Sequence, residues 1–111
     1  MPLVTILTDL DELAAKKKEV CEGVHNAVKS ALGKPDQYIT VAFTKSEYIT
    51  VGGKEASVVV EVDSIGGDFN SLIGEICKVL GDVGGVPAEK VVGTFRGVSF
   101  KEFAMNGRSL G

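Results

Sequence analysis

The chain has 111 residues, of which 44% are hydrophobic and 24% are charged, and its formal net charge is −3. This length and composition predict one compact domain over residues 1–111. The acidic balance argues against a nucleic-acid partner, and no apolar run approaches the roughly 18 residues that span a membrane. No secretory signal is visible, so we expect a cytoplasmic protein with no membrane partner.

The first predicted elements are a strand and a long helix. Residues 3–8 are apolar and β-branched, which favours a strand. From residue 10 to residue 32 the apolar side chains recur with helical spacing, and a basic run at residues 16–18 is expected on the solvated side. Gly33 supplies a C-terminal stop, and Pro35 prevents continuation.

Further strands are predicted by apolar and β-branched runs at residues 38–44, 48–51, 57–62 and 91–95. The run at 57–62 is mostly apolar on both faces, which is typical of a buried, parallel-paired strand. A second amphipathic helix is expected from Asp68 to Leu80. Asp68 is expected to cap that helix, as Thr8 and Asp9 are expected to cap the first.

The single histidine and the two cysteines predict no chemistry by themselves. Cys21 and Cys77 lack a CxxC spacing and fall in helical patterns, which favours buried thiols in a reducing compartment over a disulfide or a metal site. His25 is expected to be a surface or packing residue. We therefore expect no metal and no cofactor.

An internal repeat relates the two halves of the chain. Gly33-Lys34-Pro35 and Gly85-Val86-Pro87 are each followed by seven residues and then a phenylalanine, and the two frames lie 52 residues apart. Each frame follows a helix that follows a strand. The sequence therefore predicts an α/β (α+β) fold of two tandem β-α-β repeats, with a four-stranded mixed sheet and two helices on one face.

Four motifs, taken together and in order, resemble one known family. They are Met1-Pro2, Gly33-Lys34-Pro35 with Tyr38-Ile39, Gly52-Gly53, and Ser64-Ile65-Gly66-Gly67. This pattern is similar to that of the macrophage migration inhibitory factor family of the tautomerase superfamily, over nearly the whole chain. The resemblance implies a trimeric tautomerase fold. It also implies cofactor-independent keto–enol tautomerisation of α-keto acids such as phenylpyruvate.

The resemblance also implies the site. By matching position it makes Pro2 the catalytic base, and it makes Lys34, the Ile65 N–H and Thr94 the substrate-binding groups. Thr94 stands where the family has an asparagine, whereas Val92 and Met105 replace its tyrosine and tryptophan. An aromatic substrate would therefore lose stacking worth about 0.5–1.5 kcal/mol per contact, and we expect weak turnover of such substrates. The family's CxxC cysteines are replaced by serine and valine, which argues against a thiol-redox role.

Pro2 can act as a base only after Met1 is removed, because an internal proline nitrogen is an amide. A free α-amine titrates near 7.7–8.0 and a proline amine higher, so a nearby cation and poor solvation are needed to favour its neutral form. Lys34 would supply that cation and hold the substrate carboxylate, while the Ile65 N–H would stabilise the enolate. Without the resemblance, Pro2 is an ordinary second residue and Lys34 an exposed charge at a helix C-terminus.

Two other functions remain open. The first is a cytokine-like signalling homologue that acts through a protein partner with little catalysis and is secreted without a signal peptide. The second is a small ligand-binding domain outside the family. The one-sided sheet and the apolar tail containing Phe100, Phe103 and Met105 predict burial by identical partners in a homotrimer. The active site is then expected at a subunit boundary.

Overall fold

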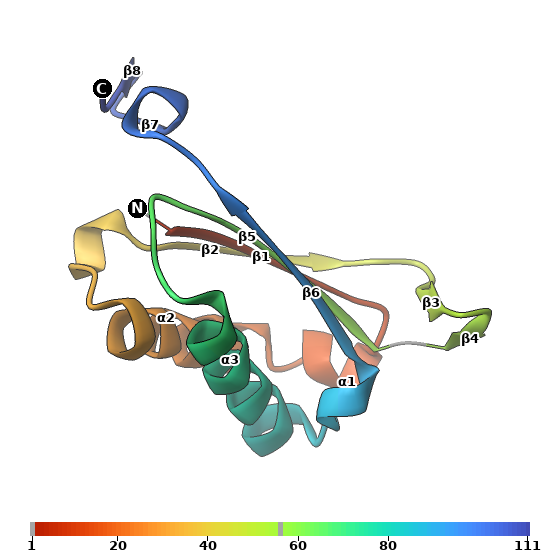
Figure 1. Ribbon diagram of the computed structural model, residues 1–111. Helices are drawn as coiled ribbons and strands as arrows, with labels where there is room; N and C mark the ends of the chain where they lie inside the picture. The colour runs from red at the N-terminus through yellow and green to blue at the C-terminus, as the bar shows by residue number, and fades with distance from the viewer. Residues whose placement is uncertain (1, 56) are drawn as a thin grey trace.

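The computed structural model describes residues 2–55 and 57–111 and has two layers, a sheet and a helical layer (Figure 1). The sheet has strand order β2-β1-β5-β6. Its strands are β1 Pro2–Thr8, β2 Thr40–Lys45, β5 Val58–Ser64 and β6 Val91–Gly97. The helices are α1 Asp11–Ala14, α2 Lys17–Leu32 and α3 Phe69–Gly84. The pairs β1–β2 and β5–β6 are parallel and β1–β5 is antiparallel, so the predicted mixed sheet of two β-α-β repeats is confirmed.

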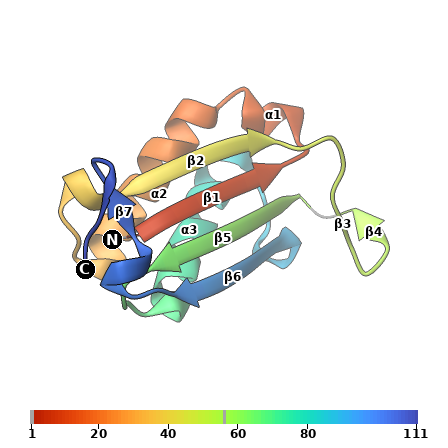
Figure 2. The same cartoon turned by 90° about the horizontal axis from the view of Figure 1, so that it is seen from above.

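Shorter elements extend the two ends of the sheet. A hairpin of β3 and β4 projects at one end, and the C-terminal segment lies at the other end, beside the N-terminus (Figures 1 and 2). These elements are β3 Thr50–Val51, β4 Lys54–Glu55, β7 Ala104–Met105, β8 Arg108–Ser109, and the 3-10 turns η1 Asp36–Tyr38, η2 Ala88–Lys90 and η3 Phe100–Glu102. The Gly52-Gly53 turn that was predicted joins β3 to β4, with φ values of 61° and 79°.

The core lies between the sheet and the helices. Burial alternates along β1 and β5, because successive side chains of a strand point to opposite faces. The fully buried residues of the helix-facing side include Val4, Ile6, Val60, Val62, Val24, Val28, Leu72 and Ile76. Burying each such side chain stabilises the fold by about 1.5–3 kcal/mol. On the opposite face Leu3, Leu7 and Val59 are half-buried and no helix covers them (Figure 1).

The repeated Gly-x-Pro frame has the same backbone conformation twice. Gly33 and Gly85 end α2 and α3 in the left-handed region, with φ of 64° and 65°. Pro35 and Pro87 then precede η1 and η2 with ψ of 148° and 147°. Glycine reaches this left-handed conformation without the steric cost that other residues incur, and proline cannot continue a helix. The repeat is therefore built by local backbone chemistry.

The single helix predicted for residues 10–32 is wrong, because it is two helices. Lys16 has φ −111° and ψ 24°, outside the helical region, and its N–H donates to the Leu13 carbonyl. Its ammonium group reaches across to the Val83 carbonyl in the last turn of α3, at 3.2 Å. This contact lies where a helix C-terminus attracts cations, so Lys16 does more than solvate a polar face.

Two of the three predicted capping residues are also wrong. Thr8 Oγ1 donates to the Ser57 carbonyl at 2.6 Å and accepts the Leu10 N–H at 3.2 Å, and an Asp9 carboxylate oxygen accepts the Ile49 N–H. Leu10 is the N-cap of α1, and neither side chain bonds an N–H within that helix. Asp68 does cap α3, accepting the N–H groups of residues 70 and 71. The prediction that β5 is a strand buried on both faces and paired in parallel is corrected as well. It runs parallel only to β6, and Glu61 on its open face is exposed. No helix in the described part of the chain has the length and apolar character needed to cross a bilayer.

Candidate active site

Pro2 is the first residue of β1, and it lies at the end of the sheet where β5 finishes. It is buried and pairs in antiparallel register with Ser64, the last residue of β5. Ile65 follows Ser64 directly and is half-buried. The register therefore brings the predicted base next to the predicted N–H donor. Met1, whose removal the hypothesis needs, lies outside the described residues.

The direction of the Ile65 N–H follows from peptide geometry. The Ser64 carbonyl and the Ile65 N–H belong to one planar trans peptide and point in opposite directions. The Ser64 carbonyl accepts the Val98 N–H at 2.9 Å, from the side of β6. Since β5 lies between β6 and β1, the Ile65 N–H points toward the side of β1, where Pro2 lies.

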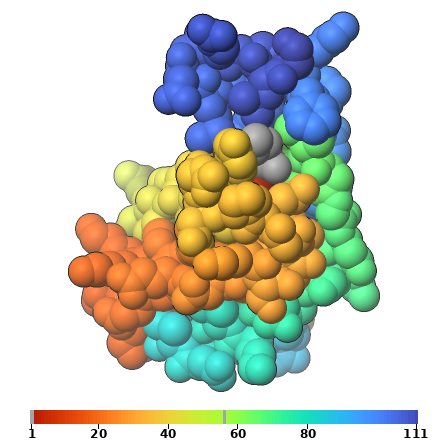
Figure 3. Space-filling view, turned by 90° about the vertical axis from the view of Figure 1, so that its left-hand side faces the viewer, coloured from red at the N-terminus to blue at the C-terminus, as the bar shows by residue number. Residues whose placement is uncertain are grey.

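Lys34 joins these two residues from the loop after α2. Its ammonium nitrogen Nζ donates to the Ile65 carbonyl at 3.4 Å. Lys34 is half-buried, so the expectation that it is exposed is wrong. An ammonium group has three N–H donors, and this bond uses one of them. Figure 3 views this end of the molecule, where the loop after α2, the turn after β5 and the C-terminal segment come together.

The internal repeat has an apolar residue at the position that corresponds to Lys34. Its counterpart in the second repeat is Val86, which is 4% exposed and belongs to the core. An apolar residue is usual two positions beyond a helix end with a left-handed glycine, because it contacts the last helical turn. The first repeat places a cation where the second places a core side chain. This exchange gives the two repeats different chemistry.

The loop that carries Lys34 is held by a cluster of charged side chains. Asp36 accepts a hydrogen bond from His25 at 2.9 Å and one from Lys29 at 3.1 Å. The bond from His25 and then the bond from Lys29 hold the pKa of the Asp36 carboxyl below its usual value. This cluster was not predicted from the sequence. The available signal was the spacing of His25 and Lys29, four residues apart and therefore on one helix face.

Thr94 does not join the other site residues within one chain. It lies in β6 opposite Glu61, three residues from the row that contains Pro2 and Ser64. Three residues of a strand span about 10 Å, and β6 is separated from β1 by β5. Thr94 is exposed on the open face, since the neighbouring Gly93 faces α3. One subunit therefore carries two separate parts of the predicted site.

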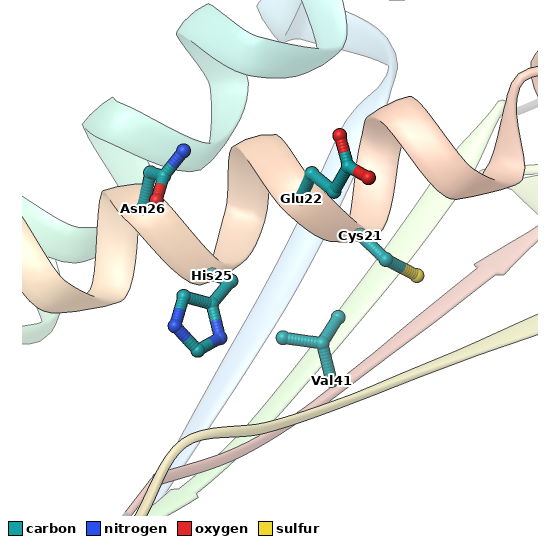
Figure 4. Close-up of a pocket in the computed structure, with 5 residues that line it drawn as sticks. All are labelled: Cys21, Glu22, His25, Asn26 and Val41. Carbon is teal, nitrogen blue, oxygen red and sulfur yellow. The ribbon is translucent and has the colours of Figure 1, made fainter. Parts of the chain in front are cut away.

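Surface hollows lie near these elements, and one of about 200 Å³ is lined by Thr94 together with Glu61, Asp63 and Arg96. Another of about 170 Å³ opens beside the start of β1 and is lined by Leu3, Asp63, Val98, Glu102, Phe103 and Ala104. Ligand pockets usually measure about 300–1,000 Å³, so a single chain does not enclose a drug-sized ligand here. A larger hollow of about 450 Å³ lies between α2 and β2 (Figure 4). Its Cys21 thiol has a pKa raised by burial, which disfavours the nucleophilic thiolate.

The described residues contain no group of three or more His, Cys, Asp or Glu side chains that is arranged to hold a metal ion. Cys21 and Cys77 are both free thiols.

The chain is similar in sequence to one protein family and in structure to solved members of it. The family model described as macrophage migration inhibitory factor matches residues 1–111. No curated protein sequence matches the chain. Among solved structures, macrophage migration inhibitory factor from Toxoplasma gondii is similar at 25% identity and a TM-score of 0.87, covering 96% of this chain and 98% of that one.

Two further solved structures are similar. Pt0534, inactivated by 2-oxo-3-pentynoate, is 25% identical with a TM-score of 0.84, covering 97% of this chain and 96% of that one. A fused 4-OT symmetric trimer is 20% identical with a TM-score of 0.86, and the match covers 97% of this chain and 95% of that one. At that identity the second likeness shows the fold alone.

Proposed function

This chain belongs to the macrophage migration inhibitory factor family, and from that premise we propose that it is a cofactor-independent keto–enol tautomerase of α-keto acids such as phenylpyruvate. The observation that carries the proposal is the convergence of Pro2, Lys34 and Ile65 at one end of the sheet. These residues come from a strand start, a helix end and a strand end that are far apart in sequence.

The proposed reaction begins at the Pro2 nitrogen. With Met1 removed, the secondary amine takes a proton from the carbon next to the ketone. The electrons of that C–H bond form the new C=C bond, and the C=O pair moves to oxygen. The resulting enolate oxygen then receives the proton from the prolinium, which restores the base. Atoms and charge balance without any other reactant, since the reaction is an isomerisation.

Lys34 and Ile65 have separate proposed parts. The two N–H donors of Lys34 that are not used on Ile65 bind the substrate carboxylate. The positive charge of Lys34 and the burial of Pro2 both disfavour a protonated proline, which keeps the base neutral. The Ile65 N–H, directed to the side of β1, donates to the oxygen that becomes negative.

We further propose a homotrimer in which the site lies at a subunit boundary. The uncovered sheet face, the small hollow beside Leu3 and the remote position of Thr94 each leave the site of one chain incomplete. A neighbouring subunit in a closed ring would supply Thr94 to Pro2. The fused 4-OT protein with the same fold is a trimer, which supports this arrangement.

A specific observation favours a second candidate, a binding or cytokine-like role with little catalysis. Val92 is 38% exposed and Met105 is half-buried, at positions where the family carries aromatic side chains. An aromatic substrate would therefore make fewer stacking contacts here, although the proposed base and anion-binding groups are present.

The test is a phenylpyruvate tautomerase assay on the purified protein with a Pro2→Gly variant as the control. The proposal expects measurable turnover that Pro2→Gly abolishes. A complementary probe is 2-oxo-3-pentynoate, an α-keto acid that inactivates Pt0534. A free Pro2 amine should add to its activated triple bond and gain the mass of one inhibitor. No turnover and no labelling in the processed protein would remove the tautomerase and leave the binding role.

A further inference from the structure

Ser64 is a buried polar residue that the proposed reaction does not use. It is fully buried, and its hydroxyl donates to the Gly66 carbonyl at 2.7 Å. Its main chain pairs with Pro2 on one side and accepts the Val98 N–H on the other. One residue thus connects the start of β1, the end of β6 and the turn that carries Ile65.

The hydroxyl bond spans Ile65. Ser64 and Gly66 flank that residue, so a bond between the Ser64 side chain and the Gly66 carbonyl closes a small ring around the Ile65 backbone. Serine hydroxyls stabilise turns in this way. The turn continues through two glycines in unusual conformations, with φ of 74° at Gly66 and 112° at Gly67. A turn with two glycines can adopt many backbone conformations, and the hydrogen bond from the Ser64 hydroxyl restricts them.

The tail end of the turn is also confined. A Cβ atom added to Gly67 would lie 2.7 Å from Leu32 Cδ2 at the end of α2, so the turn passes close to that helix. The main chain of Ser64 holds one end of the turn, Leu32 limits the other, and the hydroxyl bond fixes the middle. Ile65 is the residue that this arrangement orients.

We propose that Ser64 is a positioning residue for the tautomerase site. Its hydroxyl fixes the turn so that the Ile65 N–H is already directed at the place where an α-keto acid bound beside Pro2 develops negative charge. This inference rests on the proposed function. A donor held in place before the reaction stabilises the transition state without reorganising, and one lost donor of this kind costs about 10²–10³ in kcat.

Thr8 provides a matched control. It is also fully buried, and its hydroxyl donates to a carbonyl, that of Ser57, at 2.6 Å. Thr8 ends β1, whereas Pro2 begins it, so about 20 Å of strand separates the two. If both buried hydroxyls contribute only to folding, removing either one should lower Tm without a specific loss of kcat. A positioning hydroxyl should affect turnover at Ser64 alone.

The experiment measures kcat and KM for phenylpyruvate, together with Tm, for wild type, Ser64→Ala, Ser64→Cys and Thr8→Val. Ser64→Ala should lower kcat about tenfold or more and change KM less than about twofold, since Lys34 still binds the carboxylate. Ser64→Cys keeps nearly the same volume with a weaker donor and should fall between, which preserves the test if the alanine variant does not fold. Thr8→Val should lower Tm while leaving kcat within about twofold.

The outcomes separate the two proposals. If wild type is active, Pro2→Gly is inactive and the Ser64 variants keep wild-type kcat, the tautomerase stands and the role of Ser64 is refuted. Equal kcat losses in Ser64→Ala and Thr8→Val also refute it. If wild type shows no turnover, the proposed function fails and the inference fails with it.

Discussion

Lys34 Nζ lies 3.4 Å from the Ile65 carbonyl oxygen, although the two residues are 31 positions apart in the chain. The contact joins the two β-α-β repeats, since Lys34 lies just beyond the helix of the first repeat and Ile65 follows the first strand of the second. It places the only cation of the candidate triad against the turn that holds the N–H donor. The candidate site therefore lies where the two repeats meet.

Replacing Lys34 with alanine should weaken substrate binding more than folding. A hydrogen bond to a charged group contributes about 1.5–3 kcal/mol, so KM should rise about tenfold or more. The second repeat has Val86 at this position, and therefore an apolar side chain is compatible with the backbone. Lys45→Ala, which removes a lysine bound to Asp11 at the far end of β2, is the control and should leave KM unchanged. An unchanged kcat/KM in Lys34→Ala contradicts the assigned role.

Mixing two inactive variants tests the subunit boundary. If Thr94 acts on the Pro2 of a neighbouring chain, a trimer assembled from Pro2→Gly and Thr94→Ala subunits contains some boundaries with both native residues. Mixed trimers should then recover activity that neither parent has. The parents are unfolded together, refolded and assayed against each refolded alone. If the two residues act within one chain, the mixed trimers should recover no activity. If Thr94→Ala alone is fully active, Thr94 is not part of the site.

Two glycine substitutions test the packing of the helical layer. A Cβ added at Gly23 in α2 would lie 2.6 Å from Val79 Cγ1 in α3, and valine has little rotamer freedom in a helix. Gly23→Ala should therefore destabilise the protein by about 1–3 kcal/mol, despite alanine's higher helix propensity. Gly74 in α3 has no atom within 4 Å of an added Cβ, so Gly74→Ala should stabilise by about 0.5–1 kcal/mol. Urea unfolding at one protein concentration measures both, and the same sign for the two contradicts the close approach.

The hydrogen bonds of Asp36 should make the stability of the protein depend on pH. Hydrogen bonds from His25 and Lys29 hold its folded-state pKa below the ordinary value of 3.8. The stability that this carboxylate contributes is therefore complete above pH 3.8 and is lost as the pH falls through the lower folded-state pKa. The Tm difference between wild type and Asp36→Asn should be present at neutral pH and vanish in that acidic range. A difference of constant size at all pH values shows that Asp36 acts through some other contact.

Local signals made much of the fold predictable. Gly33 and Pro35 act on their own backbone, so their effect can be recognised without knowing the neighbours, and the same holds for the second copy of the frame. The strand at residues 3–8 was likewise predictable from its own apolar and β-branched residues. The fold class, the repeats and the helix end at residue 32 followed from such signals and agree with the structure.

Contacts between distant segments were not predictable in the same way. The break at Lys16 has no glycine or proline to mark it, and the lysine's partner, the Val83 carbonyl, lies 67 residues away. The half-burial of Lys34 depends on the turn at Ile65, and the cluster at Asp36 depends on where the chain returns after Gly33. The resemblance supplied Thr94, but only the register showed that it is remote from Pro2 in one chain.

The central claim is that the Pro2 nitrogen is the base, and the removal of Met1 tests it most directly. Acylation draws the proline lone pair into an amide, which can neither accept nor return a proton. Samples with different degrees of methionine removal are compared by intact mass and by phenylpyruvate turnover. Specific activity should increase in proportion to the processed fraction and extrapolate to zero for unprocessed protein. Full activity in a homogeneous sample that retains Met1 would contradict the mechanism, even with the fold and the trimer intact.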